Sequence, residues 1–468
     1  MKLRNLLGLL LGCLLLTMTS SLEAAEIKGV RYQVDDNYLR LVVDIEGDIG
    51  KVTQEINPSK TELIFFIPGE IKVELPTLMD LGGYAKSVEV FKQPDGVELK
   101  ITLKEPTNWR TMTLKNPSRF VVDIDEPARV ERSEKLTKGI EYQYYKFPLG
   151  SSSVRVHVVQ IEPGAADIVP ILAWDKMGNL EVVSSMTKRY NAIAGVNGGY
   201  FSWAGQYLGN LKINGEWVTG DPQERTAWGF TKEGKNVVGT LGYRGKFSVD
   251  TIPDWSLKIN GINIPRGENQ AVLYNSRQGT KTKTNQWGLE LGISRGQIIE
   301  RKSENSLINR GDWVLSAHGQ EKDMISYLVP GDKVTVEHLV DSKWDQASHI
   351  IGAGPRLIEN GKVNVTSKQE AFPSDISVGR APRTAIGEMK DGTVWLIVVD
   401  GRSWQSAGMS LTELANFLNK MGIYNAMNLD GGGSSEMVVN QKIKNKPSDG
   451  AERSVGSSII IVPRKSSR

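Results

Sequence analysis

The sequence has almost no cysteine: its single cysteine, Cys13, lies in the N-terminal leader. Removal of residues 1–25 would leave a chain with no thiol, which excludes disulfide bonds and cysteine chemistry. Such a chain would depend on burial of its hydrophobic core for stability outside a cell.

Two further absences narrow the function. No stretch after residue 25 is long and apolar enough to span a membrane, so we expect no membrane span after cleavage of the leader. The chain has 57 Lys and Arg against 54 Asp and Glu, a net charge of +3, which does not favour nucleic-acid binding.

Histidine is also scarce, with four residues. No pair of them has the spacing of metal ligands, so we predict no metal site and no cofactor. Acidic turns such as the one at Asp400 could hold calcium, but no run matches a calcium-binding loop. The alternation of His157 and His338 with apolar residues predicts packing roles, whereas His318 and His349 are candidates for a pocket.

The N-terminus has the order of a secretory signal peptide. Two positive charges within residues 1–4 precede an apolar run over residues 6–18, and small or polar residues end at Ala25. We therefore expect a secreted or envelope-associated protein, extracellular or periplasmic. A retained membrane anchor and lipidation at Cys13 are the alternatives, although the apolar run continues beyond that cysteine.

Residues 26–128 are predicted to form a β-sandwich. A turn of Asn-Pro-Ser followed by Lys or Arg occurs twice, at residues 57–60 and 116–119, and an apolar strand follows each copy. The predicted strands are residues 38–45, 62–67, 97–103 and 119–124. The run Asn-Pro-Ser-Arg-Phe-Val-Val-Asp-Ile resembles the AMIN domain, which implies binding to the cell wall; a structural spacer is the alternative.

Residues 129–138 are charged and follow a proline, which predicts a linker, and residues 139–468 form the second region. Within it a capping box of Ser410 and Glu413 predicts a helix over residues 411–421. Apolar strands at residues 394–399 and 426–429 flank this helix, so we expect a β-α-β unit with parallel strands. The 48 glycines indicate many tight turns. The predicted fold class is α+β, with an N-terminal β-sandwich followed by a strand-rich mixed α/β catalytic domain.

Both strands of this unit are followed by an aspartate, Asp400 and Asp430. Ligands gather at the carboxyl ends of such strands, and two converging carboxylates are what cleavage of a glycosidic bond needs. The glycines and serines after Asp430 predict a cradle of backbone N–H groups for an anion, which Arg383 or Arg402 would clamp. Either aspartate could instead cap a turn, and Arg383 could be an ordinary surface residue.

Five motifs with this order resemble the phosphodiester glycosidase family over roughly residues 139–463. They are residues 197–201 (Asn-Gly-Gly-Tyr-Phe), 352–357, 382–387, 400–402 and 428–435. The resemblance implies a pocket with Asp400, Asp430 and Arg383 as catalytic residues. The expected substrate-binding residues are Asn197, Gly198, Gly199, Arg402, Gly431, Gly432, Gly433, Ser434 and Ser435. The Asn-Gly-Gly run is equally typical of a hairpin turn, and Glu436 adds a third carboxylate with no assigned role.

Two functional classes follow. The first is a secreted hydrolase that cleaves a sugar-1-phosphodiester, or a related glycosidic bond, in cell-envelope or extracellular polysaccharide. The second is a non-catalytic protein that binds cell-wall glycan. In both cases the expected partners are a carbohydrate or phosphodiester-linked glycan and, through the N-terminal domain, the cell wall.

Overall fold

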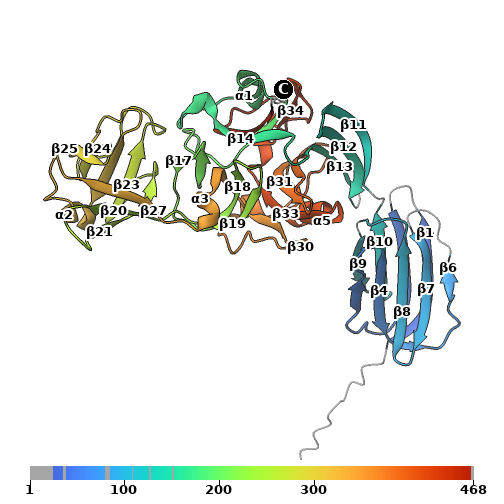
Figure 1. The fold of residues 1–468 in the computed structure, drawn as a ribbon. Coiled ribbons are helices and arrows are strands. Elements are labelled where there is room, and N and C mark those ends of the chain that lie inside the picture. Colours follow the sequence, from blue (N-terminus) through green and yellow to red (C-terminus); the bar gives the residue numbers. More distant parts are fainter. Residues whose placement is uncertain are drawn as a thin grey trace, which may run out of the picture. The chain divides into compact units, whose positions relative to one another are not determined.

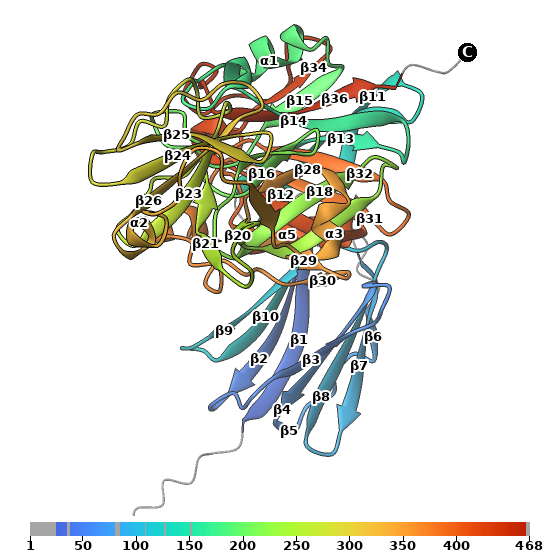
Figure 2. The same cartoon turned by 60° about the vertical axis from the view of Figure 1, so that its left-hand side comes forward.

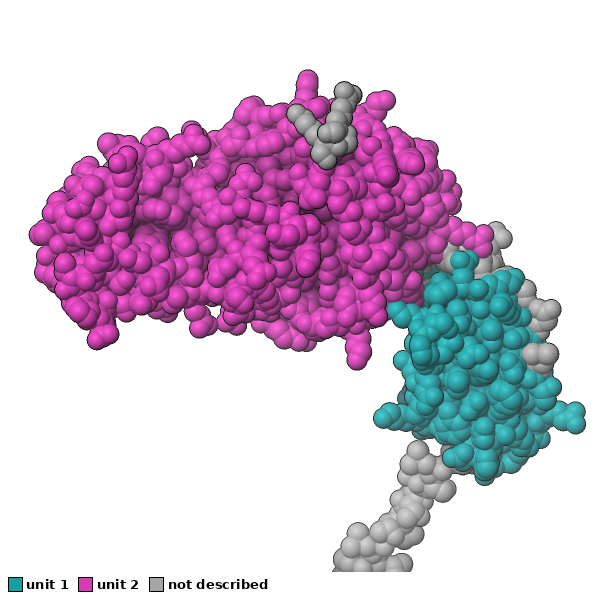
Figure 3. Space-filling view, viewed as in Figure 1, with its two compact units in different colours: residues 1–125 teal, residues 126–468 magenta. Residues whose placement is uncertain are grey.

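The computed structural model describes residues 25–34, 38–79, 85–107, 109–125, 128–149 and 152–464. The predicted signal peptide lies outside these residues except for Ala25. The chain divides into two compact units, residues 1–125 and 126–468, which Figure 3 shows in different colours.

Unit 1 contains two five-stranded sheets (Figure 1). The first has the order β5 (Glu70–Ile71), β1 (Glu26–Val34), β2 (Tyr38–Glu46), β10 (Arg119–Asp125) and β9 (Trp109–Leu114). The second has the order β3 (Thr53–Ile56), β4 (Glu62–Pro68), β8 (Gly96–Leu103), β7 (Ala85–Gln93) and β6 (Leu78–Met79). The four strands predicted in this region are therefore confirmed as β2, β4, β8 and β10.

Alternation of buried and partly buried side chains along each strand explains how these sheets share one core. In β4 the side chains of Leu63, Phe65 and Ile67 are buried, and the residues between them are only partly buried. The ring of Phe65 contacts two rings of the other sheet, those of Trp109 and Phe120, at centroid distances of 5.6 and 5.7 Å. Apolar residues of both sheets thus form a single cluster.

Unit 2 is built around an eight-stranded sheet. Its order is β11 (Arg129–Thr137), β12 (Ile140–Leu149), β13 (Ser152–Ile161), β32 (Val394–Val399), β31 (Arg383–Met389), β33 (Ile423–Asn428), β29 (Arg356–Glu359) and β30 (Lys362–Val363). The prediction of a linker over residues 129–138 is wrong, because β11 occupies most of it and pairs with β12. β11 is an exposed edge strand held by backbone hydrogen bonds, so its charged composition did not reveal it.

The predicted helix and its flanking strands are confirmed. Helix α5 (Leu411–Lys420) begins with the capping box of Ser410 and Glu413, and its ring of Phe417 stacks on Phe147 of β12. β31 pairs in antiparallel fashion with both β32 and β33. The two strands that flank the helix are therefore parallel, as expected, but β31 lies between them and they are not neighbours.

Two further sheets complete the body of unit 2. One has the order β14 (Ala166–Leu172), β36 (Ser457–Pro463), β15 (Ala194–Asn197), β34 (Met437–Val439) and β35 (Lys442–Ile443). The other has the order β17 (Glu216–Thr219), β16 (Leu211–Ile213), β28 (Ala347–Gly352), β18 (Arg225–Thr231) and β19 (Asn236–Leu241). Residues of both sheets join one face of the eight-stranded sheet in a common apolar cluster, while α5 covers the other face.

A second lobe of unit 2 is formed by residues between β19 and β28, and it lies at the left in Figure 1 and comes forward in Figure 2. Its first sheet is β21 (Ser256–Ile259), β20 (Gly245–Val249) and β27 (Val334–His338). Its second sheet is β22 (Gly261–Ile262), β23 (Gln270–Asn275), β26 (Trp313–His318), β24 (Leu289–Ser294) and β25 (Gln297–Lys302). The apolar core of this lobe is continuous with the body of unit 2, since the same cluster includes Trp217 of β17, Ala227 of β18 and Ile350 of β28.

The remaining helices are short: α1 (Val183–Arg189), α2 (Gln320–Met324), α3 (Ser342–Asp345), α4 (Ser374–Ser377), and the 3-10 turns η1 (Ala173–Asp175) and η2 (Gly432–Ser434). In the part of the chain that the structure describes, no helix has the length and apolarity to span a membrane. The strand-rich composition expected from the glycines is thus confirmed.

Candidate active site

A cavity of about 380 Å³, here called the Asp430 cavity, opens beside the C-terminal end of β33. Residues predicted from the sequence make up much of its wall: Arg383, Arg402, Asp430, Gly431, Gly432, Gly433 and Ser434. The carboxyl end of β33 is thus the place where these seven residues meet.

Asp430 is the central carboxyl group of this cavity. One of its oxygens, Oδ1, accepts a 2.9 Å hydrogen bond from the backbone N–H of Gly431. Burial raises the pKa of Asp430 to about 6, although hydrogen bonds from Ser434 and Gly431 oppose the shift. A carboxyl group with this pKa can exchange a proton near neutral pH.

Most of the N–H groups after Asp430 are bonded within the protein, which contradicts the predicted cradle of several free N–H groups. The amide of Gly432 donates to the carbonyl of Pro382 at 2.9 Å, and the amides of Ser434 and Ser435 donate to carbonyls of the same turn, each at 3.2 Å. Since these amides are already bonded, an anion in the cavity must be held mainly by side chains. Glycine is needed at Gly432 because its φ is +63°.

Three arginines supply that positive charge. Arg383 is 3% exposed and donates from Nε to the carbonyl of Met409 at 2.9 Å, with further bonds to two other carbonyls of the loops around it. Arg402 makes no ion pair within the described residues, and Arg453 is paired with Asp449. The cavity therefore combines the carboxyl group of Asp430 with cations that suit a phosphodiester.

Four predicted binding residues lie behind the wall and support it. The side chain of Asn197, which is fully buried, donates from Nδ2 to the backbone carbonyl of Asp430 and accepts from Thr384. Gly198 and Gly199 leave no room for a Cβ atom, against Ser457 and Tyr207. Ser435 is buried as well, and its hydroxyl has no hydrogen-bond partner among the described residues.

Asp400 does not line the Asp430 cavity, contrary to the expectation that the two carboxylates converge. Its Oδ1 accepts a 2.9 Å hydrogen bond from the backbone N–H of Lys446, and its Oδ2 lies 3.5 Å from Nε2 of His157. β31 pairs with both β32 and β33. If the two pairings are extended beyond the ends of the strands, Asp400 lies opposite Pro382 and Asp430 lies opposite Arg383. Because successive residues of a strand face opposite sides, this offset of one residue separates the two carboxylates.

Other residues of the cavity were missed in the sequence. Asp375 of α4 is the second carboxylate of the wall, and nothing in its short turn marked it. Trp203 is 82% exposed, with the guanidinium of Arg453 at 5.8 Å from its ring centroid. The buried Oδ1 of Asn428 has no hydrogen-bond partner within the described residues, while its Nδ2 donates to Tyr200. That oxygen is an acceptor available to a bound sugar.

Glu436, the third carboxylate singled out in the sequence, is buried and does not line the Asp430 cavity. Burial raises its pKa to about 9, and the neighbouring Glu452 adds to this shift because two carboxylates side by side repel each other. Glu436 is therefore protonated near neutral pH. Its backbone N–H donates to Oδ1 of Asn197, which links it to the support of Asp430.

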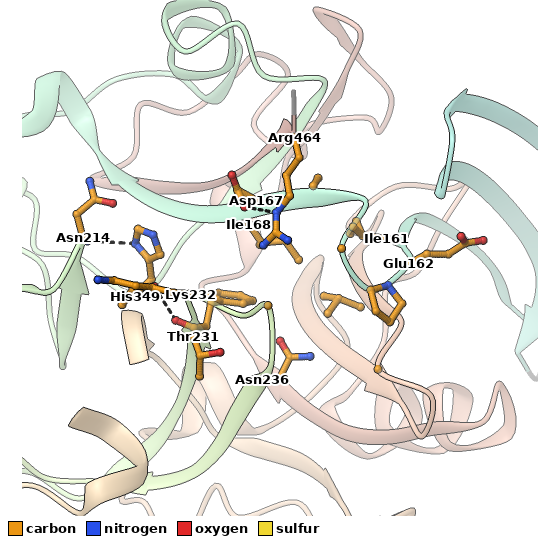
Figure 4. Close-up of a pocket in the computed structure, with 18 residues that line it drawn as sticks. Ile161, Glu162, Asp167, Ile168, Asn214, Thr231, Lys232, Asn236, His349 and Arg464 are labelled. Carbon is orange, nitrogen blue, oxygen red and sulfur yellow. Dashed lines mark hydrogen bonds and ion pairs between the residues drawn. The ribbon is translucent and has the colours of Figure 1, made fainter. Parts of the chain in front are cut away.

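The histidines follow the sequence predictions in part. His157 is 4% exposed and its Nδ1 lies 2.9 Å from the hydroxyl of Tyr142, and the ring of His338 packs against Trp217, so both packing predictions are confirmed. His349 lines a separate cavity of about 320 Å³, shown in Figure 4. That cavity also contains Val394, at the other end of β32 from Asp400. Across the described residues, no three His, Cys, Asp or Glu side chains gather where they could hold a metal ion.

Comparison with known proteins identifies the class. Residues 280–462 match the family model described as phosphodiester glycosidase, which confirms the resemblance seen in the motifs for this part of unit 2. The match is shorter than the predicted residues 139–463 and lies wholly in unit 2. The resemblance of unit 1 to the AMIN domain stays a prediction.

Two relatives are similar to this chain over shorter stretches. The chain is 39% identical over 158 residues to N-acetylglucosamine-1-phosphodiester alpha-N-acetylglucosaminidase of Bos taurus, which covers 31% of this chain and 29% of that protein. It is 43% identical over 88 residues to the SPbeta prophage-derived uncharacterized protein YomE of Bacillus subtilis, 19% of this chain and 14% of that protein. The chain thus spans less than a third of the length of these relatives.

The fold also resembles a solved structure. A hypothetical protein from Synechocystis matches with a TM-score of 0.65 at 20% identity, over 94% of this chain and 81% of that one. This likeness concerns the fold alone.

Proposed function

We propose that unit 2 hydrolyses a sugar-1-phosphodiester, or a related glycosidic bond, at the Asp430 cavity. One observation carries the proposal: a carboxyl group whose pKa is raised to about 6 shares a cavity with three arginines. The relatives named above include one named N-acetylglucosamine-1-phosphodiester alpha-N-acetylglucosaminidase, and residues 280–462, which match the family model, include most of those that line this cavity.

The chemistry follows from the charges. Arg402 and Arg383 hold the negatively charged phosphodiester, and the bond between the sugar C1 and the phosphate oxygen breaks. Water adds to C1 and the phosphate leaves as a monoester, so one proton must be removed from water. Asp430 is suited to donate or accept a proton near neutral pH, and Asp375 offers the second carboxylate that such reactions use.

The test is hydrolysis of the methyl diester of N-acetylglucosamine-1-phosphate by the full chain. Asp430→Asn is expected to lower kcat by about 100- to 10,000-fold, the range for loss of a general acid or base. Arg383→Ala is expected to raise KM and lower kcat, and Asp391→Asn, at an exposed turn outside the cavity, serves as the control. Equal activity of all four proteins contradicts the proposed roles. Sugar binding without any hydrolysis by the wild type would favour the non-catalytic glycan-binding protein.

The dependence of the rate on pH assigns the role of Asp430. Since the pKa of Asp430 is raised to about 6, a kcat/KM that falls above this pH identifies a proton donor. A kcat/KM that rises through the same pH identifies a base. A profile without a step near pH 6 would mean that Asp430 does not titrate in the reaction.

For the setting of this activity, we propose the cell envelope or the extracellular space. The proposal is supported by the leader sequence and by the resemblance of residues 26–128 to the AMIN domain. The test is sedimentation with purified bacterial cell walls. Unit 1 has its own apolar core and can be tested alone beside the full chain. Cell walls that bind neither protein would contradict the proposal.

A further inference from the structure

A second, larger cavity of unit 2 lies across one loop from the Asp430 cavity. The loop is closed by backbone pairing of Phe201 with Tyr207 and by a 2.9 Å bond from Ser202 N to the carbonyl of Gln206. Phe201 and Trp203 line the Asp430 cavity, whereas Ser202, Gln206 and Tyr207 line the second one. The two cavities are therefore the two sides of a single loop.

This second cavity, here called the Gln278 cavity, has a volume of about 780 Å³, twice that of the Asp430 cavity. Volumes of this size are typical of sites for organic ligands. It lies between the body of unit 2, represented by the Phe201–Tyr207 loop, and the second lobe, represented by Arg266 and Gln278. A ligand that spans both lobes is thus within reach of both walls.

The side chains of the Gln278 cavity are mainly amides and hydroxyls. Oε1 of Gln278 and Nε of Arg266 are buried and have no hydrogen-bond partner among the described residues. Such unpaired buried atoms cost free energy unless a ligand satisfies them. An acceptor and a donor in this arrangement match the hydroxyl and amide groups of a sugar chain.

Two exposed tryptophans are close to these cavities: Trp203 lines the Asp430 cavity, and Trp287 follows Asn285 of the Gln278 cavity by two residues. Trp203, at the tip of the shared loop, is 82% exposed, and Trp287 of the second lobe is 62% exposed. The backbone N–H of Trp287 donates to Oδ1 of Asn285, a residue of the Gln278 cavity. Large exposed aromatic rings are costly in water and are suited to packing against the apolar faces of sugar rings.

We infer that the Gln278 cavity binds the rest of a polymeric glycan whose sugar-1-phosphodiester occupies the Asp430 cavity. The inference rests on the proposed function and adds the substrate class: a glycan chain that crosses the Trp203 loop, rather than a small phosphodiester. Trp287 and Gln278 bind this chain and take no part in bond cleavage.

Two substrates test this. One is the methyl diester of N-acetylglucosamine-1-phosphate, and the other carries an N-acetylglucosamine pentasaccharide in place of the methyl group. Wild-type kcat/KM is expected to be at least about tenfold higher for the long substrate, a gain of about 1.4 kcal/mol. Trp287→Ala and Gln278→Leu are each expected to remove most of that gain through KM and to leave the short substrate unchanged. Tyr327→Ala, at an exposed aromatic residue outside both cavities, is the control.

Calorimetric titration with the free pentasaccharide separates this inference from the proposed function. We expect Trp287→Ala and Gln278→Leu to weaken binding about tenfold. If the wild type cleaves neither substrate, the proposed function fails, and the titration still decides whether the glycan binds here. Equal kcat/KM for both substrates, or pentasaccharide binding that neither variant weakens, overturns the inference.

Discussion

Nδ2 of Asn197 donates a 2.6 Å hydrogen bond to the backbone carbonyl of Asp430, a residue 233 positions later in the chain. The backbone N–H of Asp430 in turn donates to the carbonyl of Gly198 at 3.1 Å. The end of β15 thus fixes the backbone of the central carboxyl residue from behind. The Asn-Gly-Gly motif supports the site without lining the cavity.

Asn197→Asp tests this support, because it keeps the acceptor for Thr384 and removes the donor to Asp430. The new carboxylate would face a carbonyl oxygen, so we expect a loss of about 1–3 kcal/mol of stability. The kcat for the methyl diester should fall by at least about tenfold even in the folded fraction, because Asp430 moves. Asn305→Asp, at an exposed loop residue, is the control and should change neither quantity. Unchanged kcat in the Asn197 variant would mean that this bond does not position Asp430.

The raised pKa of Asp430 predicts a dependence of stability on pH. The folded state holds the proton of Asp430 up to about pH 6, whereas the unfolded chain releases it near pH 4, so this carboxyl lowers the free energy of unfolding as pH rises between these values. Asp430→Asn removes this loss. The free energy of unfolding of the variant, relative to that of the wild type, should therefore be higher at pH 7.5 than at pH 3.5 by up to about 3 kcal/mol. Urea unfolding of both proteins at the two pH values measures this difference. If the variant and the wild type differ by the same amount at both pH values, the raised pKa of Asp430 is contradicted.

Asp400→Asn distinguishes the two aspartates that the sequence placed together. The carboxylate of Asp400 bonds to the backbone of Lys446 and lies outside the Asp430 cavity, so we expect a loss of stability of about 1–3 kcal/mol. The kcat of the folded protein should stay within about threefold of the wild type, in contrast to Asp430→Asn. Thermal unfolding and kcat measured on the same sample provide the comparison. A loss of kcat as large as that of Asp430→Asn would assign Asp400 to the chemistry.

Two glycines near Arg383 form a matched pair. Both Gly408 and Gly379 have a φ of +82°, but a Cβ atom at Gly408 would lie 2.5 Å from the carbonyl oxygen of Ala381, whereas at Gly379 it would meet nothing within 4 Å. Gly379→Ala should therefore cost only the backbone strain, about 1 kcal/mol. Gly408→Ala should cost clearly more and raise KM, because Met409 beside it accepts the bond from Arg383. Equal melting temperatures of the two variants would contradict the crowding at Gly408.

Sequence patterns predicted those elements whose main interactions join residues close together in the chain. The capping box of Ser410 and Glu413 predicted the start of α5, because both hydrogen bonds join residues three apart. The turn at residues 57–60 and the apolar run that follows it predicted β4. The ordered motifs likewise indicated the family of residues 280–462.

Tertiary structure decided which of these residues meet. The sequence by itself determined that Asp400 and Asp430 follow two parallel strands, but the insertion of β31 between those strands, with a register offset of one residue, turned the two carboxylates to different sides. The tertiary structure also brought Asp375 and Arg453 to the cavity, from segments in which no sequence pattern marked them. Strand order and register depend on contacts between residues far apart in the chain, and short-range periodicity carries no information about them.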